Sequence, residues 1–110
     1  MFVEWSPRRI LAYCEPVDMR KSFRGLVGLV QNVLQEDPLS NCLYVFFNRR
    51  GNYLKLVTWD RTGYCLFAKQ LERGKFSLPS GEEKQEISEQ TFRLILDGIV
   101  LGKRRAMRYK

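Results

Sequence analysis

The segment from residue 43 to residue 71 constrains the fold more than any other part of the chain. It is rich in aromatic and aliphatic residues and is interrupted twice, at Arg49-Arg50-Gly51-Asn52 and at Arg61-Thr62-Gly63. Both interruptions contain glycine, which hairpin turns need where φ is positive. The pattern predicts a three-stranded antiparallel meander with strands Leu43 to Asn48, Tyr53 to Asp60 and Tyr64 to Leu71.

A first loop of four residues and a second of three predict which side chains share a face of this meander. One face would be core and would carry Leu43, Val45, Phe47, Leu54, Leu56, Thr58, Leu66 and Ala68. The other would combine aromatic and basic side chains: Tyr44, Phe46, Tyr53, Lys55, Val57, Trp59, Cys65, Phe67 and Lys69. Lys55 would then lie opposite Lys69, a like-charge pair that an anion or a nearby acid would offset.

Elements on either side of the meander complete the expected fold. The apolar run 10–14 predicts an edge strand. Apolar residues at helical spacing predict a long helix from Asp18, its N-cap, to about Glu36, before Asp37-Pro38. A second helix should follow the polar loop 80–85, begin near Ser88 and bury Phe92, Ile95, Leu96 and Ile99. The fold class predicted is α+β: a small antiparallel sheet, formed by the meander and the N-terminal strand, packed by the long helix, with the second helix C-terminal.

Length and charge predict one domain with a basic tail. A chain of 110 residues forms one core, so we expect a single domain over residues 1–102. Five of the basic groups lie in residues 103–110, which lack apolar periodicity and are expected to be disordered. Residues 49–75 are also basic, with seven basic groups against two acids. Such clustering favours an anionic partner, whereas a solvated surface is the plain alternative.

The residue types argue against most enzyme classes. The chain has no histidine, which removes the commonest general base and zinc ligand, and its three cysteines are too widely spaced for a metal knuckle. Asp18, Asp37 and Asp60 are explained by capping, by a stop and by a turn. We therefore expect no enzymatic activity, no metal and no cofactor. The absence of a signal peptide and of a long apolar run predicts a cytoplasmic protein without a membrane span.

Several motifs in this order resemble a known family, the Orf2-like accessory proteins, often called TnpB, of insertion-sequence family sixty-six. The RNA-guided nuclease that shares that name is a different, far longer protein. The match covers roughly residues 10 to 100. Its motifs are Asp18-Met19-Arg20-Lys21-x-Phe23-x-Gly25-Leu26, Asp37-Pro38, Leu43-x-Val45-Phe46, Asn48-Arg49-Arg50-Gly51, and Trp59-Asp60-x-x-Gly63-x-Cys65-Leu66-Phe67-x-Lys69-x-Leu71-Glu72-x-Gly74-x-Phe76.

The resemblance implies a role in transposition, beside a transposase and a second small protein of the same mobile element, and it brings no catalytic residues. The first hypothesis is an accessory factor that binds DNA through its basic hairpin and sheet face and helps to assemble the transposition complex. Its candidate nucleic-acid contacts are Arg20, Lys21, Arg24, Arg49, Arg50, Lys55, Lys69, Arg73, Lys103, Arg104 and Arg105.

Two other hypotheses stay open. The chain could be a protein adaptor that binds the transposase, or a second copy of itself, without contacting DNA. The candidate partner-binding residues are Tyr44, Phe46, Tyr53, Trp59 and Phe67. A hydrolase with an unusual carboxylate site is the third hypothesis and the least supported, because no aspartate is left needing a catalytic explanation.

Overall fold

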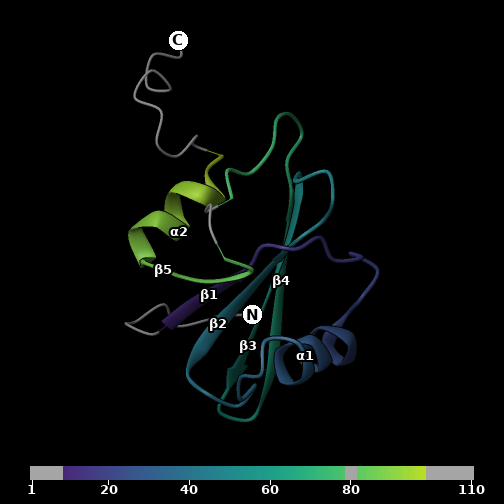
Figure 1. Ribbon diagram of the computed structural model, residues 1–110, viewed down its shortest axis with the longest axis vertical. Coiled ribbons are helices and arrows are strands. Elements are labelled where there is room, and N and C mark those ends of the chain that lie inside the picture. Colours follow the sequence, from purple (N-terminus) through teal and green to yellow (C-terminus); the bar gives the residue numbers. More distant parts are fainter. Residues whose placement is uncertain (1–8, 79–81, 99–110) are drawn as a thin grey trace.

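The computed structural model describes residues 9–78 and 82–98 (Figure 1). Within these ranges five strands form one sheet in the order β4-β3-β2-β1-β5, and two helices lie on opposite sides of it. The predicted meander is confirmed as β2, β3 and β4. In chain order the elements are β1 (Arg9–Tyr13), α1 (Phe23–Asn32), β2 (Cys42–Phe47), β3 (Tyr53–Asp60), β4 (Gly63–Gln70), β5 (Lys84–Ile87) and α2 (Glu89–Leu96).

The expectation of an antiparallel sheet is wrong, because β1 runs parallel to β2 and lies inside the sheet. The chain passes from β1 to β2 through α1, and a helical crossover returns the next strand in the same direction. Ile10 therefore pairs with Leu43 of β2 on one side and with Ile87 of β5 on the other. Ile10, Leu11 and Ala12 are all buried, as in strands covered on both faces. A mixed sheet replaces the α+β arrangement that was predicted.

The long helix predicted from Asp18 to Glu36 is also wrong, because α1 covers only Phe23–Asn32. Asp18 lies in a turn before the helix, where its carboxylate accepts the backbone N–H of Arg20 at 2.9 Å. Aspartate side chains compete with helical hydrogen bonds in this way. At the other end, Gln35 has a φ of 57°, a left-handed conformation that a right-handed helix cannot continue.

Strand β5 occupies part of the region predicted as a polar loop. Lys84-Gln85-Glu86-Ile87 contains a single apolar residue, so no alternation indicates a strand. Pairing with β1 forms it, with Lys84 beside Tyr13, and the N–H of Cys14 extends the ladder to the carbonyl of Glu83 at 2.8 Å. Tertiary pairing therefore overrides a weak local preference.

The register predicted for the meander is right for its first hairpin and wrong for its second. Leu43 pairs with Thr58 in β2 and β3, as a four-residue loop requires. The second turn has two residues, with Arg61 at a φ of 55°, so Thr58 pairs with Cys65. This slip by one residue exchanges the two faces of β4. The predicted pairing of Lys55 with Lys69 is therefore wrong, and these two lysines lie on opposite faces of the sheet.

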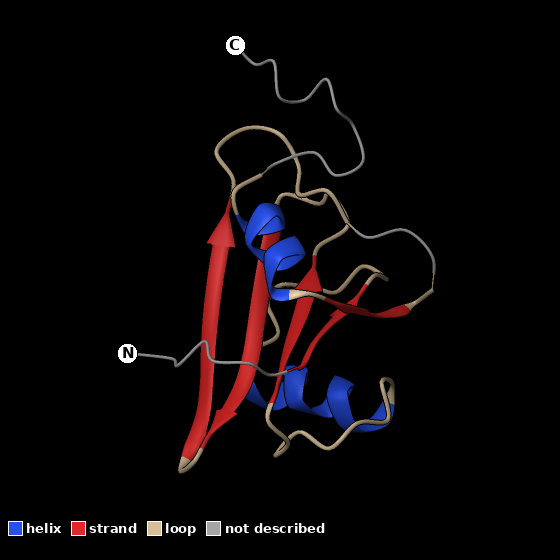
Figure 2. Cartoon of the chain, turned by 90° about the vertical axis from the view of Figure 1, so that its left-hand side faces the viewer, coloured by secondary structure: helices blue, strands red, loops and turns tan. Residues whose placement is uncertain are grey.

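The first helix was expected to pack on the core face of the meander, but it lies on the opposite face. α1 packs on the face that contains Tyr44 and Phe46, and α2 packs on the face that contains Leu43 and Val45. Most predictions for α2 are confirmed: Ser88 caps it by accepting the N–H of Thr91, and Phe92 and Ile95 are buried, whereas Leu96 is only partly buried. Ile99 lies outside the described residues. Figure 2 shows the strands fanning out as the sheet twists between the helices.

Gly28 gives a test of this packing. It lies within α1, and apart from the neighbouring residues and the helix's own backbone no atom comes within 4 Å of the position that a Cβ would occupy. Glycine in a helix interior costs about 1 kcal/mol relative to alanine. We expect Gly28→Ala to raise the free energy of unfolding by about 1 kcal/mol in urea denaturation. Gly25→Ala is the control and should gain less, because its Cβ would lie 3.1 Å from the side chain of Lys21. A lower free energy of unfolding in Gly28→Ala would contradict the open space found beside the Cβ position of Gly28.

Candidate nucleic-acid interface

Two loops lie side by side where β3 begins and β4 ends, at the top of Figure 1. Phe76 donates its N–H to the carbonyl of Gly51 at 2.7 Å, and Leu71 donates to that of Asn52 at 2.8 Å. The ring of Phe76 is buried against Phe47, with centroids 6.1 Å apart. These contacts fix the second loop on the first. Together the loops carry four exposed basic side chains, which we call the basic loop pair: Arg49, Arg50, Arg73 and Lys75.

The first of these loops is held together by Asn48. Its Oδ1 accepts the N–H of Asn52 at 3.0 Å, its Nδ2 donates to the Oδ1 of Asn52 at 2.9 Å, and its carbonyl accepts the N–H of Gly51 at 3.1 Å. Gly51 has a φ of 76°, a conformation that side chains rarely tolerate. The backbone that carries Arg49 and Arg50 is therefore fixed by local bonds, while both side chains are exposed.

The charges of the basic loop pair are not neutralised by ion pairs. Within residues 9–78 and 82–98, no carboxylate lies within 4.0 Å of a nitrogen of these four side chains. Four cations against the single carboxylate of Glu72 in these two loops leave a net positive charge, which attracts anions. Five basic side chains elsewhere do form ion pairs: Arg9, Arg20, Arg61, Lys84 and Arg93.

Lys75 was not among the residues predicted from the sequence. Its side chain packs against Gly51, across from the two arginines of the first loop. The available signal was Phe76, a lone apolar residue in a polar stretch, which indicates that the loop is anchored. The residue against which Phe76 packs depends on the tertiary fold, so the sequence alone does not predict that Lys75 lies beside the hairpin.

Two lysines predicted to contact phosphates instead bind carbonyl groups of the chain. Lys55 is only 8% exposed, and its Nζ donates to the carbonyl of Lys21 at 2.8 Å. The Nζ of Lys69 donates to the carbonyl of Leu96 at 2.6 Å, at the C-terminal end of α2. A cation is favourable at that end of a helix because unpaired carbonyls gather there. Both ammonium groups thus serve the fold.

The three basic residues predicted near the start of α1 are placed differently from one another. Arg20 binds Asp18 through its guanidinium, with a shortest distance of 2.7 Å, and this hydrogen bond lowers the pKa of the Asp18 carboxyl to about 2. Lys21 packs its methylene groups near Gly25. Arg24 lines a groove on α1 and is exposed. They are not gathered into one anion site.

The five aromatic residues predicted to bind a partner do not form one exposed face. Tyr44 and Phe46 are buried under α1. Trp59 and Tyr53 are half-buried on the same side of the sheet, and Trp59 packs edge-on against Tyr64 with centroids 5.1 Å apart. Phe67, turned to the other side by the register slip, is 37% exposed.

The predicted contacts Lys103, Arg104 and Arg105 lie outside the described residues. The described chain ends at Gly98, where an added Cβ would lie 4.0 Å from the side chain of Leu71 and thus beside the loop that carries Arg73.

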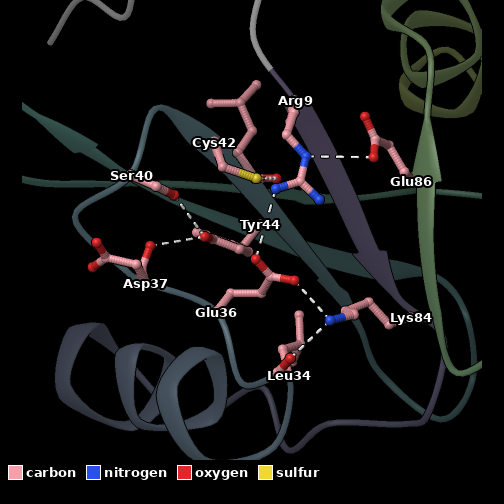
Figure 3. Close-up of polar contacts among 10 residues, drawn as sticks. Arg9, Leu34, Glu36, Asp37, Ser40, Cys42, Tyr44, Lys84 and Glu86 are labelled. Carbon is pink, nitrogen blue, oxygen red and sulfur yellow. Dashed lines mark hydrogen bonds and ion pairs between the residues drawn. The ribbon is translucent and has the colours of Figure 1, made fainter.

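A separate polar network joins the segment after α1 to the far edge of the sheet (Figure 3). Glu36 accepts from Lys84 at 2.7 Å and lies 3.7 Å from Arg9, which also pairs with Glu86 at 3.4 Å. Lys84 donates further to the carbonyl of Leu34 at 2.9 Å. The sequence separations are too large for any local pattern to reveal this network. It fastens the segment after α1 to β5.

The thiol of Cys42 and the hydroxyl of Tyr44 are buried beside this network. Both groups make the free energy of unfolding depend on pH in the alkaline range. Burial raises the pKa of the Cys42 thiol from 9.0 to about 11 and that of the Tyr44 hydroxyl from 10.0 to about 12. The unfolded chain releases these protons first, so the free energy of unfolding should fall as pH rises above about 9 and continue to fall through the folded pKa values. Urea denaturation at increasing pH measures this slope. Cys42→Ala should flatten it, and an unchanged slope would contradict the assignment to Cys42.

No helix in residues 9–78 and 82–98 is long and apolar enough to cross a membrane. In the same ranges, no three side chains among Cys, Asp and Glu come together as a metal ion would require.

Fold and charge together define a small protein with a mixed sheet, a helix on each face and a basic loop pair at one end. A family model described as IS66 Orf2 like protein matches residues 8–106. The chain therefore belongs to the IS66 Orf2-like family of insertion-sequence proteins, and the resemblance identified from its motifs is confirmed.

Two proteins of Sinorhizobium fredii are similar to the chain. The uncharacterized protein y4jC is 36% identical over 92 residues, which cover 83% of this chain and 79% of that protein. The uncharacterized protein y4hO is 48% identical over 65 residues, which cover 59% of this chain and 56% of that protein. No solved structure matches the chain.

Proposed function

We propose that the chain is a non-catalytic accessory factor of transposition that binds DNA through the basic loop pair. The observation that carries the proposal is that four exposed cations are held together by the bonds from Phe76 to Gly51 and from Leu71 to Asn52, with no ion-pair partner in the described residues. Arginine forks match phosphate oxygens in a bidentate manner. The role in transposition rests on the family, whose members belong to insertion sequences.

In this account the DNA contacts differ from those proposed from the sequence alone. Arg49, Arg50, Arg73 and Lys75 contact phosphates, whereas Lys55 and Lys69 hold the fold. The basic residues after Gly98 add contacts that do not read sequence. The element's transposase and its second small protein are the proposed partners in the complex that the chain helps to assemble.

A titration of labelled duplex DNA with the full chain at several salt concentrations tests this function. The four contacts of the basic loop pair predict that log K falls with log salt at a slope of about −3.6, so affinity should drop at least roughly 100-fold between about 50 and 200 mM. Contacts made by the basic residues after Gly98 would steepen this slope further. Single-stranded DNA of the same sequence should give a shallower slope. Absence of binding at the lowest salt concentration would rule out the proposal.

A protein adaptor is the second candidate, favoured by a groove of about 480 Å³ between α1 and Tyr64. Phe23, which lines it, is 44% exposed, and Val27 forms part of its floor. An adaptor would retain the transposase at high salt and would lose it when Phe23 is replaced by Ser. Co-purification that is unaffected by Phe23→Ser would count against this candidate.

A further inference from the structure

The two edges of the sheet differ in how well they resist pairing with another strand. β5 has four residues, and its charged side chains form ion pairs, Lys84 with Glu36 and Glu86 with Arg9 (Figure 3). Short, charged edges discourage strand addition. β4 is eight residues long and contains neither proline nor any charged residue except Lys69, whose ammonium group is bound to the carbonyl of Leu96. β4 is therefore the unprotected edge of the described sheet.

The hydrogen bonds of the meander show which backbone groups of β4 point away from the sheet. Asn48 donates to the carbonyl of Tyr53, so this is a hydrogen-bonded pair, and such pairs alternate along an antiparallel ladder. By this alternation, the even-numbered residues of β3 bond to β4. Leu71 donates its N–H to the carbonyl of Asn52, which is also an even-numbered residue, so this bond follows the same alternation. The β4 residues bonded to β3 are then Gly63, Cys65, Phe67 and Lys69, and those with outward-pointing groups are Tyr64, Leu66, Ala68 and Gln70.

We propose that β4 pairs antiparallel with β4 of a second copy of this chain, about a two-fold axis at Phe67. This register pairs Leu66 with the second copy's Ala68 and Tyr64 with its Gln70, so all four residues with outward-pointing backbone groups bond across the axis. It also places the 37% exposed Phe67 beside its own symmetry mate. Aromatic pairs of this kind stabilise a ladder.

The strand complements itself, which favours a second copy over an unrelated strand. In this register Cys65 lies opposite Lys69, so no like charges face one another within the paired β4 strands. On the side of α1, the groove lined by Phe23 and Tyr64 opens beside the new strand. Gly28, which also lines the groove, leaves room for side chains of the second copy. The result is one continuous sheet with a basic loop pair at each end.

The proposed dimer is independent of DNA binding, so its formation can be measured with the protein alone. Ala68→Pro removes an outward N–H and leaves the bonds between β3 and β4 intact, since proline is tolerated at an edge where its N–H would face solvent. We expect the full chain and the control Ala68→Thr to sediment as dimers. We expect the dimer dissociation constant of Ala68→Pro to rise at least tenfold. A wild-type chain that stays monomeric at high concentration, or an Ala68→Pro variant that dimerises as tightly, would overturn the pairing.

Disulfide trapping tests the register even if the proline variant fails to fold. Phe67 would form a non-hydrogen-bonded pair with its mate, with Cα atoms about 4.5 Å apart, a separation that a disulfide can bridge. In a Cys65→Ser background, mild oxidation should convert Phe67→Cys into a covalent dimer. Ala68→Cys, one residue away, should stay uncrosslinked because it faces Leu66 of the other copy. Equal crosslinking of the two variants, or none in Phe67→Cys, would contradict the proposed axis.

Discussion

The double variant Arg49→Ala with Arg50→Ala should bind duplex DNA roughly 50-fold more weakly than the wild-type chain at about 0.1 M salt. Each lost phosphate contact also removes about one unit from the slope of log K against log salt, so the slope should become shallower by about two. The two guanidinium groups are exposed and make no ion pair within the described parts of the chain, so their removal should leave the fold intact. Fluorescence anisotropy of labelled DNA measures both quantities.

A charge-matched control separates a site from a general effect of net charge. Arg61→Ala with Arg93→Ala removes the same two charges, but Arg61 lies at the opposite end of β3 and pairs with Asp60, and Arg93 pairs with Glu89 on α2. This control should retain most of the wild-type affinity and slope. Equal losses in the two double variants would mean that positive charge acts only over the whole surface.

Replacing Phe46 by Ala should cause the largest loss of stability among the aromatic substitutions considered for a partner surface. Phe46 is 0% exposed and packs in the cluster that α1 forms with the sheet. Removing a buried phenylalanine ring costs about 3–5 kcal/mol through lost burial and the cavity left behind. The whole free energy of unfolding for a domain is about 5–15 kcal/mol, so this variant should unfold at much lower urea concentration.

Leu39→Ala is the matched control, because Leu39 is 53% exposed and its loss should change the free energy of unfolding by less than about 0.5 kcal/mol. If Phe46 instead lay on a free partner-binding face, its replacement would cost as little as that of Leu39. A small effect in Phe46→Ala would therefore contradict the packing of α1 on this face.

The parts of the fold that could be predicted are those whose signals are local. The two glycine-containing interruptions of the apolar pattern located β2, β3 and β4, and Ser88 marked the start of α2. The parallel partner of β1 and the strand β5 depend on pairing between distant segments, which no local pattern records. Which side chains of β4 lie on which face of the sheet depends on whether the turn before β4 has two or three residues. The left-handed conformation of Arg61 allows the two-residue turn. Gly63, the residue that suggested a three-residue turn, instead pairs with Asp60.

The candidate site was only partly predictable for the same reason. Arg49 and Arg50 followed from the hairpin turn itself. Lys75 could not be placed beside them without the contact of Phe76 with Phe47. Lys55 and Lys69 looked like ligands for phosphate because their carbonyl partners come from distant segments. A lysine in a basic segment therefore indicates a phosphate site only once the structure shows whether a backbone carbonyl of the chain accepts its ammonium group.

An NMR titration of the isotope-labelled full chain with duplex DNA shows whether the basic loop pair binds DNA. We expect the backbone amides of residues 49–51 and 73–76 to shift first and most, and these shifts to reverse as salt is added. The amides of β5 and of the groove on α1 should stay in place. Shifts centred on α1 or β5, with none in the basic loop pair, would contradict this expectation.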